Sequence, residues 1–187
     1  RLERIFYLGR AHEGLADLAG AAAFYEQALA QDPEFVDARR AVTEVALRHD
    51  VFLMEAFMYR CHPQTAKLVE LIRDGAIGEV RILQVSFSYD LGDSDQAYAN
   101  IRLRNDVAGG GIMDVGCYTL SMARLVAGAA LGMAGPAEPE SLEGVAHIGE
   151  RGRVDEWATA VLRFPGDILA NVSVGNMCSI DATLRVW

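Results

Sequence analysis

The sequence predicts an α+β fold, in which an N-terminal helical hairpin precedes a partial domain whose mostly antiparallel sheet is covered by helices on one face. Three observations predict it. Residues 1–48 are rich in alanine and place apolar residues at helical spacing. Residues 65–126 hold a strand-like alternation between two helical patterns, and residues 142–187 hold strand-like runs separated by turn signals. Successive hairpins of this kind are typical of an antiparallel sheet with helices on one side.

Residues 1–48 form the first predicted segment. Apolar side chains recur at helical spacing before the break at Asp32-Pro33, namely Leu15, Leu18, Ala22, Tyr25 and Leu29. Residues 2–35 resemble a single tetratricopeptide repeat in their spacing of small and aromatic residues. An ordinary amphipathic helix pair fits the same pattern, and one repeat cannot bury its apolar face alone. Both interpretations stay open, and a further helix is predicted from Val36 to Asp50.

Residues 49–187 have the pattern of a mixed domain. The apolar run Val51–Met54 ends at Glu55 and predicts a buried strand that delivers polar residues at its end. Residues 65–74 form an amphipathic pattern that predicts a helix, and residues 79–90 alternate as a strand does. The sequence therefore predicts strand, helix and strand in this order.

The rest of the domain begins with a polar stretch, residues 91–108, which is expected to be a long loop. A helix is predicted over Ile112–Val126, followed by four strands over 142–149, 154–164, 168–174 and 182–187. The predicted sheet presents alternating Val, Leu, Ile and Ala on one face, and no further helix follows to cover it. We therefore expect a homo-oligomer that forms through this open sheet face.

Composition excludes several classes of protein. The net charge of −9 over 187 residues, without a cluster of Lys and Arg, argues against binding to nucleic acid or to an anionic membrane surface. Apolar stretches fall short of the roughly 20 residues that span a bilayer, and no targeting peptide is readable, so we expect a cytoplasmic protein. The three cysteines are widely spaced and suit reduced thiols, and we assign no metal.

The strongest local signal is the block from Gly109 to Tyr118, which has three glycines at the start of a predicted helix. Asp114 and Tyr118 are four residues apart and therefore project from one helical face, and the glycines allow a ligand to approach the backbone. A tyrosine beside a carboxylate can exchange the proton that accompanies hydride transfer at a carbonyl. A helix start in which Asp114 complements the dipole and Tyr118 is a core aromatic also fits.

Three stretches resemble one family of enzymes. Residues 53–64, which include Glu55, Arg60 and His62, the glycine-rich block, and Val154-Asp155-Glu156 are similar to the Gfo/Idh/MocA oxidoreductases. The similarity is to the branch with glucose–fructose oxidoreductase, pentose dehydrogenase and dihydrodiol dehydrogenase. It runs from about residue 40 to the end of the chain.

The resemblance implies roles for particular residues. Asp114 would bind the substrate, a sugar or polyol, and Tyr118 would act as acid/base with NAD or NADP as cofactor. Glu55, Arg60 and His62 would lie near the substrate. Alternatively, Arg60 pairs with Glu55 or Asp114, and His62 caps the next helix.

The sequence also departs from this family. Residues 1–50 hold no strand followed by the glycine-rich motif of a Rossmann domain, and Lys67 is the only lysine, so the Glu-Lys-Pro motif is missing. We expect the Rossmann domain to be absent from this chain, and the chain alone to bind NAD(P)H weakly and to be inactive. A non-catalytic carbohydrate-binding or oligomerisation module, or a helical-repeat adaptor, are the alternatives.

Overall fold

The computed structural model describes residues 36–54 and 56–187 together with Ala23, leaving aside the side chains of residues 36–40. The predicted repeat-like hairpin and Glu55 lie outside the described residues. The chain divides into two compact units, residues 1–56 with 106–108, and residues 57–105 with 109–187.

The described part of the first unit contains helix α3 (Val36–Arg48), which confirms the helix predicted there. The strand predicted over Val51–Met54 is wrong, because these residues form no strand and their side chains are exposed, Phe52 by 86%. A strand forms only where a neighbouring strand takes its backbone hydrogen bonds. Here the Val51 amide instead donates to the Ala46 carbonyl at 3.0 Å, at the end of α3.

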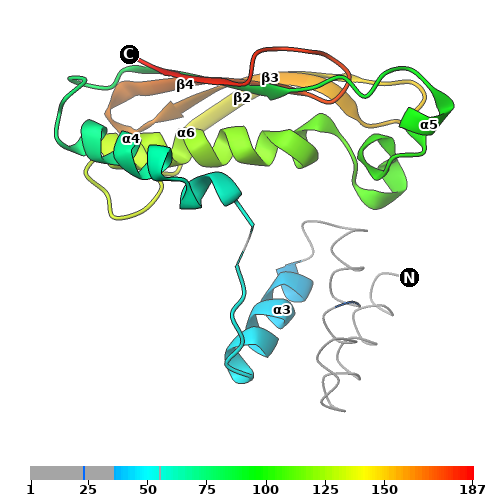
Figure 1. Cartoon of the computed structure of the whole chain (residues 1–187), viewed down its shortest axis with the longest axis horizontal. Helices are drawn as coiled ribbons and strands as arrows, with labels where there is room; N and C mark the ends of the chain where they lie inside the picture. Colours follow the sequence, from blue (N-terminus) through cyan, green and yellow to red (C-terminus); the bar gives the residue numbers. More distant parts are fainter. Residues whose placement is uncertain (1–22, 24–35, 55) are drawn as a thin grey trace. The chain divides into compact units, whose positions relative to one another are not determined.

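The second unit is built on a five-stranded sheet with strand order β2-β3-β4-β1-β5 (Figure 1). The strands are β1 (Ile82–Ser88), β2 (Ser141–Ile148), β3 (Asp155–Phe164), β4 (Ile168–Gly175) and β5 (Thr183–Val186). Strands β1 and β4 run parallel, whereas the other neighbouring pairs are antiparallel. The predicted mostly antiparallel sheet is confirmed.

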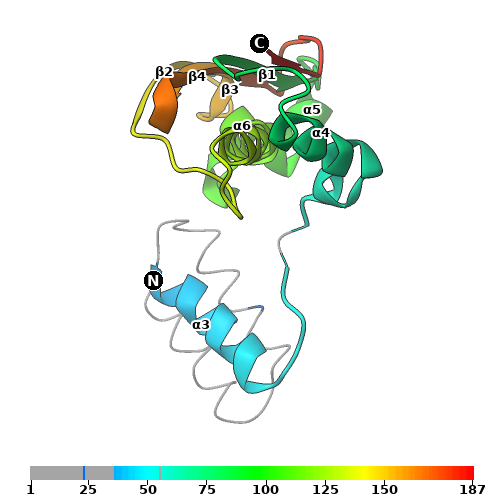
Figure 2. The same cartoon turned by 90° about the vertical axis from the view of Figure 1, so that its left-hand side faces the viewer.

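Two helices, α4 (Pro63–Arg73) and α6 (Cys117–Ala130), lie on one face of this sheet, as the two views in Figures 1 and 2 agree. A single π-helical turn, Ile112–Gly116, precedes α6. The stretch predicted as a long loop contains the short helix α5 (Asp95–Tyr98) and two 3-10 turns, Ile101–Leu103 and Asn105–Val107. No described helix is long and apolar enough to cross a membrane.

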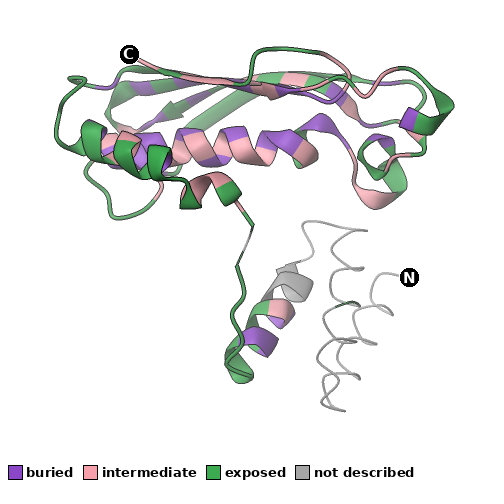
Figure 3. Ribbon diagram, in the orientation of Figure 1, coloured by how far each residue is buried: buried purple, intermediate pink, exposed green. Residues whose placement is uncertain are grey.

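The core lies between α6 and the strands β1, β3 and β4, where the buried residues gather in Figure 3. Its fully buried members include Leu83, Val126, Ala127, Leu162, Phe164 and Ala170. Burying a Leu, Val or Phe side chain stabilises a fold by about 1.5–3 kcal/mol. The expectation that no helix covers the apolar sheet face is wrong for β1, β3 and β4, because α6 covers them, whereas β2 is exposed along its whole length.

The face of the sheet turned away from α6 is mixed in character. On β3, the outward residues Trp157 and Val161 are 42% and 51% exposed. Polar residues lie between and beside them, since Thr159 pairs with Ser173, Val161 pairs with Asn171, and the Trp157 ring stacks on that of His147. This outer face combines separate apolar side chains with a polar background.

Candidate functional site

The glycines at the start of the π-helical turn are packed against the protein itself. A Cβ on Gly109 would come within 2.7 Å of the Arg102 carbonyl oxygen. Gly110 has φ of +123°, which only glycine adopts readily, and a side chain there would meet the Asp155 carboxylate. The expectation that these glycines leave room for a ligand is wrong at both positions, because backbone and side-chain atoms of the same domain fill that space.

Asp155, at the start of β3, binds the amide groups at this helix start. Its Oδ2 accepts the Ile112 N–H at 2.6 Å, and the Gly111 N–H also donates to it. Burial raises the pKa of the Asp155 carboxyl, and these backbone hydrogen bonds oppose the shift. Free N–H groups at a helix start can bind phosphate. This start is taken by a carboxylate, so the residues of the glycine block do not fit the pyrophosphate of a dinucleotide.

Asp114 and Tyr118 line the same hollow, which has a volume of about 390 Å³. The other residues that line it are Met58, Phe87, Tyr89, Leu91, Arg102 and Val115. The Asp114 side chain is only 17% exposed, so its carboxylate does not point freely into solvent. The hollow thus joins one carboxylate, two tyrosines and one arginine to an apolar wall.

Two residues that the sequence analysis did not single out hold the Asp114 carboxylate. Arg102 Nε donates to Asp114 Oδ1 at 2.9 Å, and the Tyr89 hydroxyl donates to Oδ2. The hydrogen bond and the charge of Asp114 raise the pKa of Arg102. Burial, followed by the hydrogen bond to Asp114, raises the pKa of Tyr89 to about 12. Tyr89 lies near the end of the alternating run of residues 79–90, directly after β1, and this position is the one feature of the sequence that pointed to Tyr89.

Tyr118 is held by other aromatic rings. Its ring meets those of Phe57 and Phe87 edge to face, with centroids 5.3 Å and 5.9 Å apart. Such pairs contribute about 0.5–1.5 kcal/mol beyond their burial. Among the residues that the structure describes, the Tyr118 hydroxyl has no hydrogen-bond partner. The ring is therefore fixed while the hydroxyl is available to a ligand.

The other predicted site residues lie elsewhere. Arg60 donates to the Ser121 hydroxyl at 2.9 Å and to its carbonyl at 3.4 Å. The expected pairing of Arg60 with Asp114 is wrong, because Arg102 occupies that place. His62 is the exposed N-cap of α4, where its Nδ1 accepts the Gln64 N–H at 3.2 Å. Neither Arg60 nor His62 lines the hollow, and Glu55 is not among the described residues.

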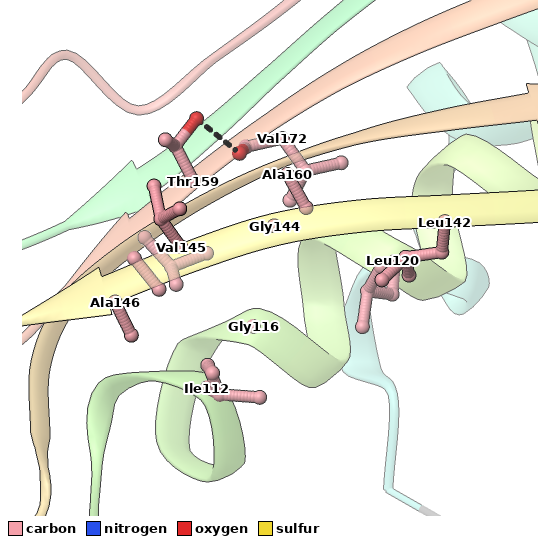
Figure 4. Close-up of a pocket in the computed structure, with 12 residues that line it drawn as sticks. Ile112, Gly116, Leu120, Leu142, Gly144, Val145, Ala146, Thr159, Ala160 and Val172 are labelled. Carbon is pink, nitrogen blue, oxygen red and sulfur yellow. Dashed lines mark hydrogen bonds between the residues drawn. The ribbon is translucent and has the colours of Figure 1, made fainter.

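A second hollow of about 300 Å³ lies between the start of α6 and the strands β2, β3 and β4 (Figure 4). Ile112 and Leu120 line it from the helical side and Leu142 from β2. The Thr159 hydroxyl at its edge donates to the Val172 carbonyl at 3.0 Å. No titratable side chain lines this hollow, so it offers no group for acid/base chemistry.

The fold and the first hollow define a class of protein, an α+β domain in which the sheet is backed by helices on one face and the long helix begins beside a partly polar hollow. Residues 65–187 match the GFO/IDH/MocA C-terminal domain. This chain belongs to the Gfo/Idh/MocA family, as its motifs predicted.

Two similar proteins are dehydrogenases. The D-xylose 1-dehydrogenase (NADP(+)) 2 of Haloferax volcanii is 44% identical over 92 residues, which cover 49% of this chain and 27% of that protein. The trans-1,2-dihydrobenzene-1,2-diol dehydrogenase of Mus musculus is 30% identical over 145 residues, covering 78% of this chain and 38% of that one. The chain thus spans well under half the length of these relatives.

Solved structures share the fold. The aldose-aldose oxidoreductase from Caulobacter crescentus, complexed with glycerol, has a TM-score of 0.66 at 23% identity and covers 87% of this chain and 49% of that one. A 3-ketoreductase from Actinomadura kijaniata, in complex with NADP and TDP-benzene, has a TM-score of 0.64 at 24% identity and covers 88% and 50%. At this level of identity the similarity extends to the fold alone.

Proposed function

We propose that this chain is the substrate-binding and catalytic portion of an NAD(P)-dependent oxidoreductase that acts on a sugar or polyol. One observation carries the proposal. Tyr118, whose hydroxyl has no partner among the described residues, lines the same hollow as an Asp114 carboxylate that two donors hold in place. The relatives that are dehydrogenases of D-xylose and of a dihydrodiol support the substrate class.

The proposed chemistry follows from these two side chains. Oxidation of an alcohol removes a hydride from carbon and a proton from oxygen, and reduction of a carbonyl adds both. In reduction, the Tyr118 hydroxyl donates its proton to the carbonyl oxygen as the hydride reaches carbon, which leaves a phenolate; in oxidation, this phenolate takes the proton from the substrate hydroxyl. Asp114 accepts hydrogen bonds from neighbouring hydroxyl groups and so orients the polyol. NAD or NADP supplies the hydride chemistry when it is bound.

The lining of the hollow suits such a substrate. Met58, Phe87 and Leu91 offer an apolar wall for the C–H groups of a sugar ring, whereas Asp114 and Arg102 face its hydroxyls. Binding sites for small molecules usually combine an apolar wall with a few placed polar groups. The lining is therefore consistent with a molecule that has both kinds of surface.

A chimera tests this function. It joins this chain, from Val51 onward, to the parts of the Haloferax volcanii D-xylose 1-dehydrogenase that lie outside the matched stretch. We expect D-xylose-dependent reduction of NADP, and we expect Asp114→Asn to raise the KM for D-xylose. A folded chimera that binds NADP but oxidises no sugar or polyol would contradict the proposal.

We also propose that the chain alone is inactive and binds NAD(P)H weakly. The support is the helix start after the glycines, where Asp155 already occupies the amide groups. Isothermal titration calorimetry on the full chain measures this directly. A dissociation constant in the micromolar range would overturn it.

A non-catalytic, oligomer-forming module is the second candidate. The observation in its favour is the outer sheet face, where Val145, Trp157 and Val161 are 73%, 42% and 51% exposed. These apolar side chains lie on one face of the sheet, where a second copy of the chain would bury them. We propose that copies of the chain associate through this face, whether or not the domain is catalytic.

A further inference from the structure

We propose that Arg102 and Tyr89 are positioning residues, which together hold the Asp114 carboxylate at the hollow shared with Tyr118. This inference rests on the proposed function, because Asp114 orients the substrate there. The glycine block then has a structural role and not a ligand-binding one. The block lets the backbone of Arg102 lie against the start of the π-helical turn.

The backbone of Arg102 is fixed on both sides. Its N–H donates to Asn100 Oδ1 at 3.0 Å, and its carbonyl accepts the Gly110 N–H at 2.7 Å. The same carbonyl accepts Asn176 Nδ2 at 3.2 Å, and Asn176 is fully buried. A Cβ on Gly109 would lie 2.7 Å from this carbonyl oxygen and would push the backbone of Arg102 away. The backbone that carries the Arg102 guanidinium is therefore held in a fixed position.

Tyr89 comes from a different element. It follows the last residue of β1, and its N–H donates to the Gly175 carbonyl at 3.1 Å, at the end of β4. Its side chain thus leaves the sheet at a fixed point, and its hydroxyl donates to Asp114 Oδ2. Burial and the hydrogen bond to Asp114 raise the pKa of Tyr89 from 10.0 to about 12, so the phenol keeps its proton over a wider pH range than an ordinary tyrosine.

The two donors act on separate oxygens of one carboxylate. Arg102 donates to Oδ1 and Tyr89 to Oδ2, so rotation of the carboxylate breaks at least one charge-assisted hydrogen bond. Charge-assisted hydrogen bonds are stronger than those between neutral groups. The third titratable group that lines the hollow beside Asp114 is Tyr118, one helical turn further on. Asp114 is therefore oriented before any substrate arrives, which is how a site avoids losing binding energy to reorganisation.

Nuclear magnetic resonance on the full chain tests the Tyr89 contact. Tyrosine is labelled with ¹³C at Cζ, and Tyr89→Phe identifies the Tyr89 signal. We expect Tyr89 to ionise with a pKa of about 12, against an ordinary value of 10.0. Asp114→Asn should lower this pKa, and it should stay above the ordinary value because burial remains. An unchanged pKa in Asp114→Asn would overturn the assignment of Tyr89.

The Arg102 contact is tested by exchange of the Tyr89 hydroxyl proton with solvent. Arg102→Ala frees the carboxylate and should speed this exchange about 10-fold or more. Arg102→Lys keeps the charge but has no planar fork, so it should restore the slow rate in part. Arg151→Ala is the matched control, because Arg151 pairs with Asp95 and lies 4.2 Å from the Tyr98 ring centre, outside this hollow.

Exchange in Arg102→Ala that stays within about twofold of the original rate, in a folded chain, would overturn the role of Arg102. If Arg102→Ala does not fold, the Arg102→Lys variant is used instead. An exchange rate in Arg102→Lys equal to that of the original chain would show that the guanidinium is not needed to hold Asp114, and would overturn the role of Arg102. Neither sugar nor cofactor enters these measurements. Unchanged exchange rates would therefore contradict the positioning role without contradicting the proposed activity. An inactive chimera would contradict the proposed activity without contradicting the contacts of Arg102 and Tyr89 with Asp114.

Discussion

Asp155 Oδ2 accepts the backbone N–H of Ile112 at 2.6 Å and so joins the start of strand β3 to the turn that carries Asp114. The carboxylate caps the helix start as an N-cap side chain does, although it comes from 43 residues further along the chain. Gly110 lies directly against this carboxylate, which explains why a residue without Cβ stands there. The position of the turn therefore depends on a contact between distant parts of the sequence.

Removal of this carboxylate should destabilise the domain. In Asp155→Ala the Ile112 N–H loses its acceptor, and we expect the free energy of unfolding to fall by about 1–3 kcal/mol. Asp155→Asn keeps one acceptor oxygen and should lose less. Urea unfolding of the three proteins measures the difference. Equal stability of Asp155→Ala and the original chain would show that the contact contributes nothing.

The glycines offer a second prediction. Gly110→Ala forces a Cβ into the Asp155 carboxylate at φ of +123°, and it should destabilise the domain by about 1–3 kcal/mol. Gly135→Ala is the matched control, because a Cβ at Gly135 meets no atom within 4 Å. We expect the control to change the unfolding free energy by less than about 0.5 kcal/mol. Thermal or urea unfolding distinguishes the two, and a harmless Gly110→Ala would contradict the packing described for the block.

The outer sheet face should mediate self-association. We expect sedimentation velocity to show dimers or larger species at high protein concentration, and Val161→Lys to shift them toward monomer, because a charge would have to be buried. Met133→Lys is the control, since Met133 is 41% exposed but follows α6 instead of lying on the sheet. A chain that stays monomeric at every concentration would rule this interface out.

Much of the fold could be predicted because local pattern and tertiary packing agree. Along β3, exposed and less exposed residues alternate from Trp157 to Phe164, as the sequence alternates. Val51–Met54 shows where this reasoning fails. An apolar run predicts a strand only if a neighbouring strand is present, and the run itself carries no information about its neighbours.

The site was predictable only in part. The spacing of Asp114 and Tyr118 follows from helical geometry, and both residues line one hollow. Arg102 and Tyr89 reach Asp114 from 12 and 25 residues away, through a loop and a strand end. No periodic pattern encodes such a contact. The glycines were also misread, because a pattern that permits close approach does not say whether a ligand or the protein itself approaches.

The central claim is that Tyr118 is the acid/base. Its most direct test is the rate of D-xylose-dependent NADP reduction by the chimera with Tyr118→Phe, compared with Tyr59→Phe. Both changes remove one hydroxyl and keep the ring, but the Tyr59 hydroxyl is bonded to Ser121 at 2.8 Å and Tyr59 does not line the hollow. We expect Tyr118→Phe to lower kcat by about 10²–10⁴-fold and Tyr59→Phe to leave it nearly unchanged. An active chimera in which Tyr118→Phe turns over as fast as Tyr59→Phe would contradict the account.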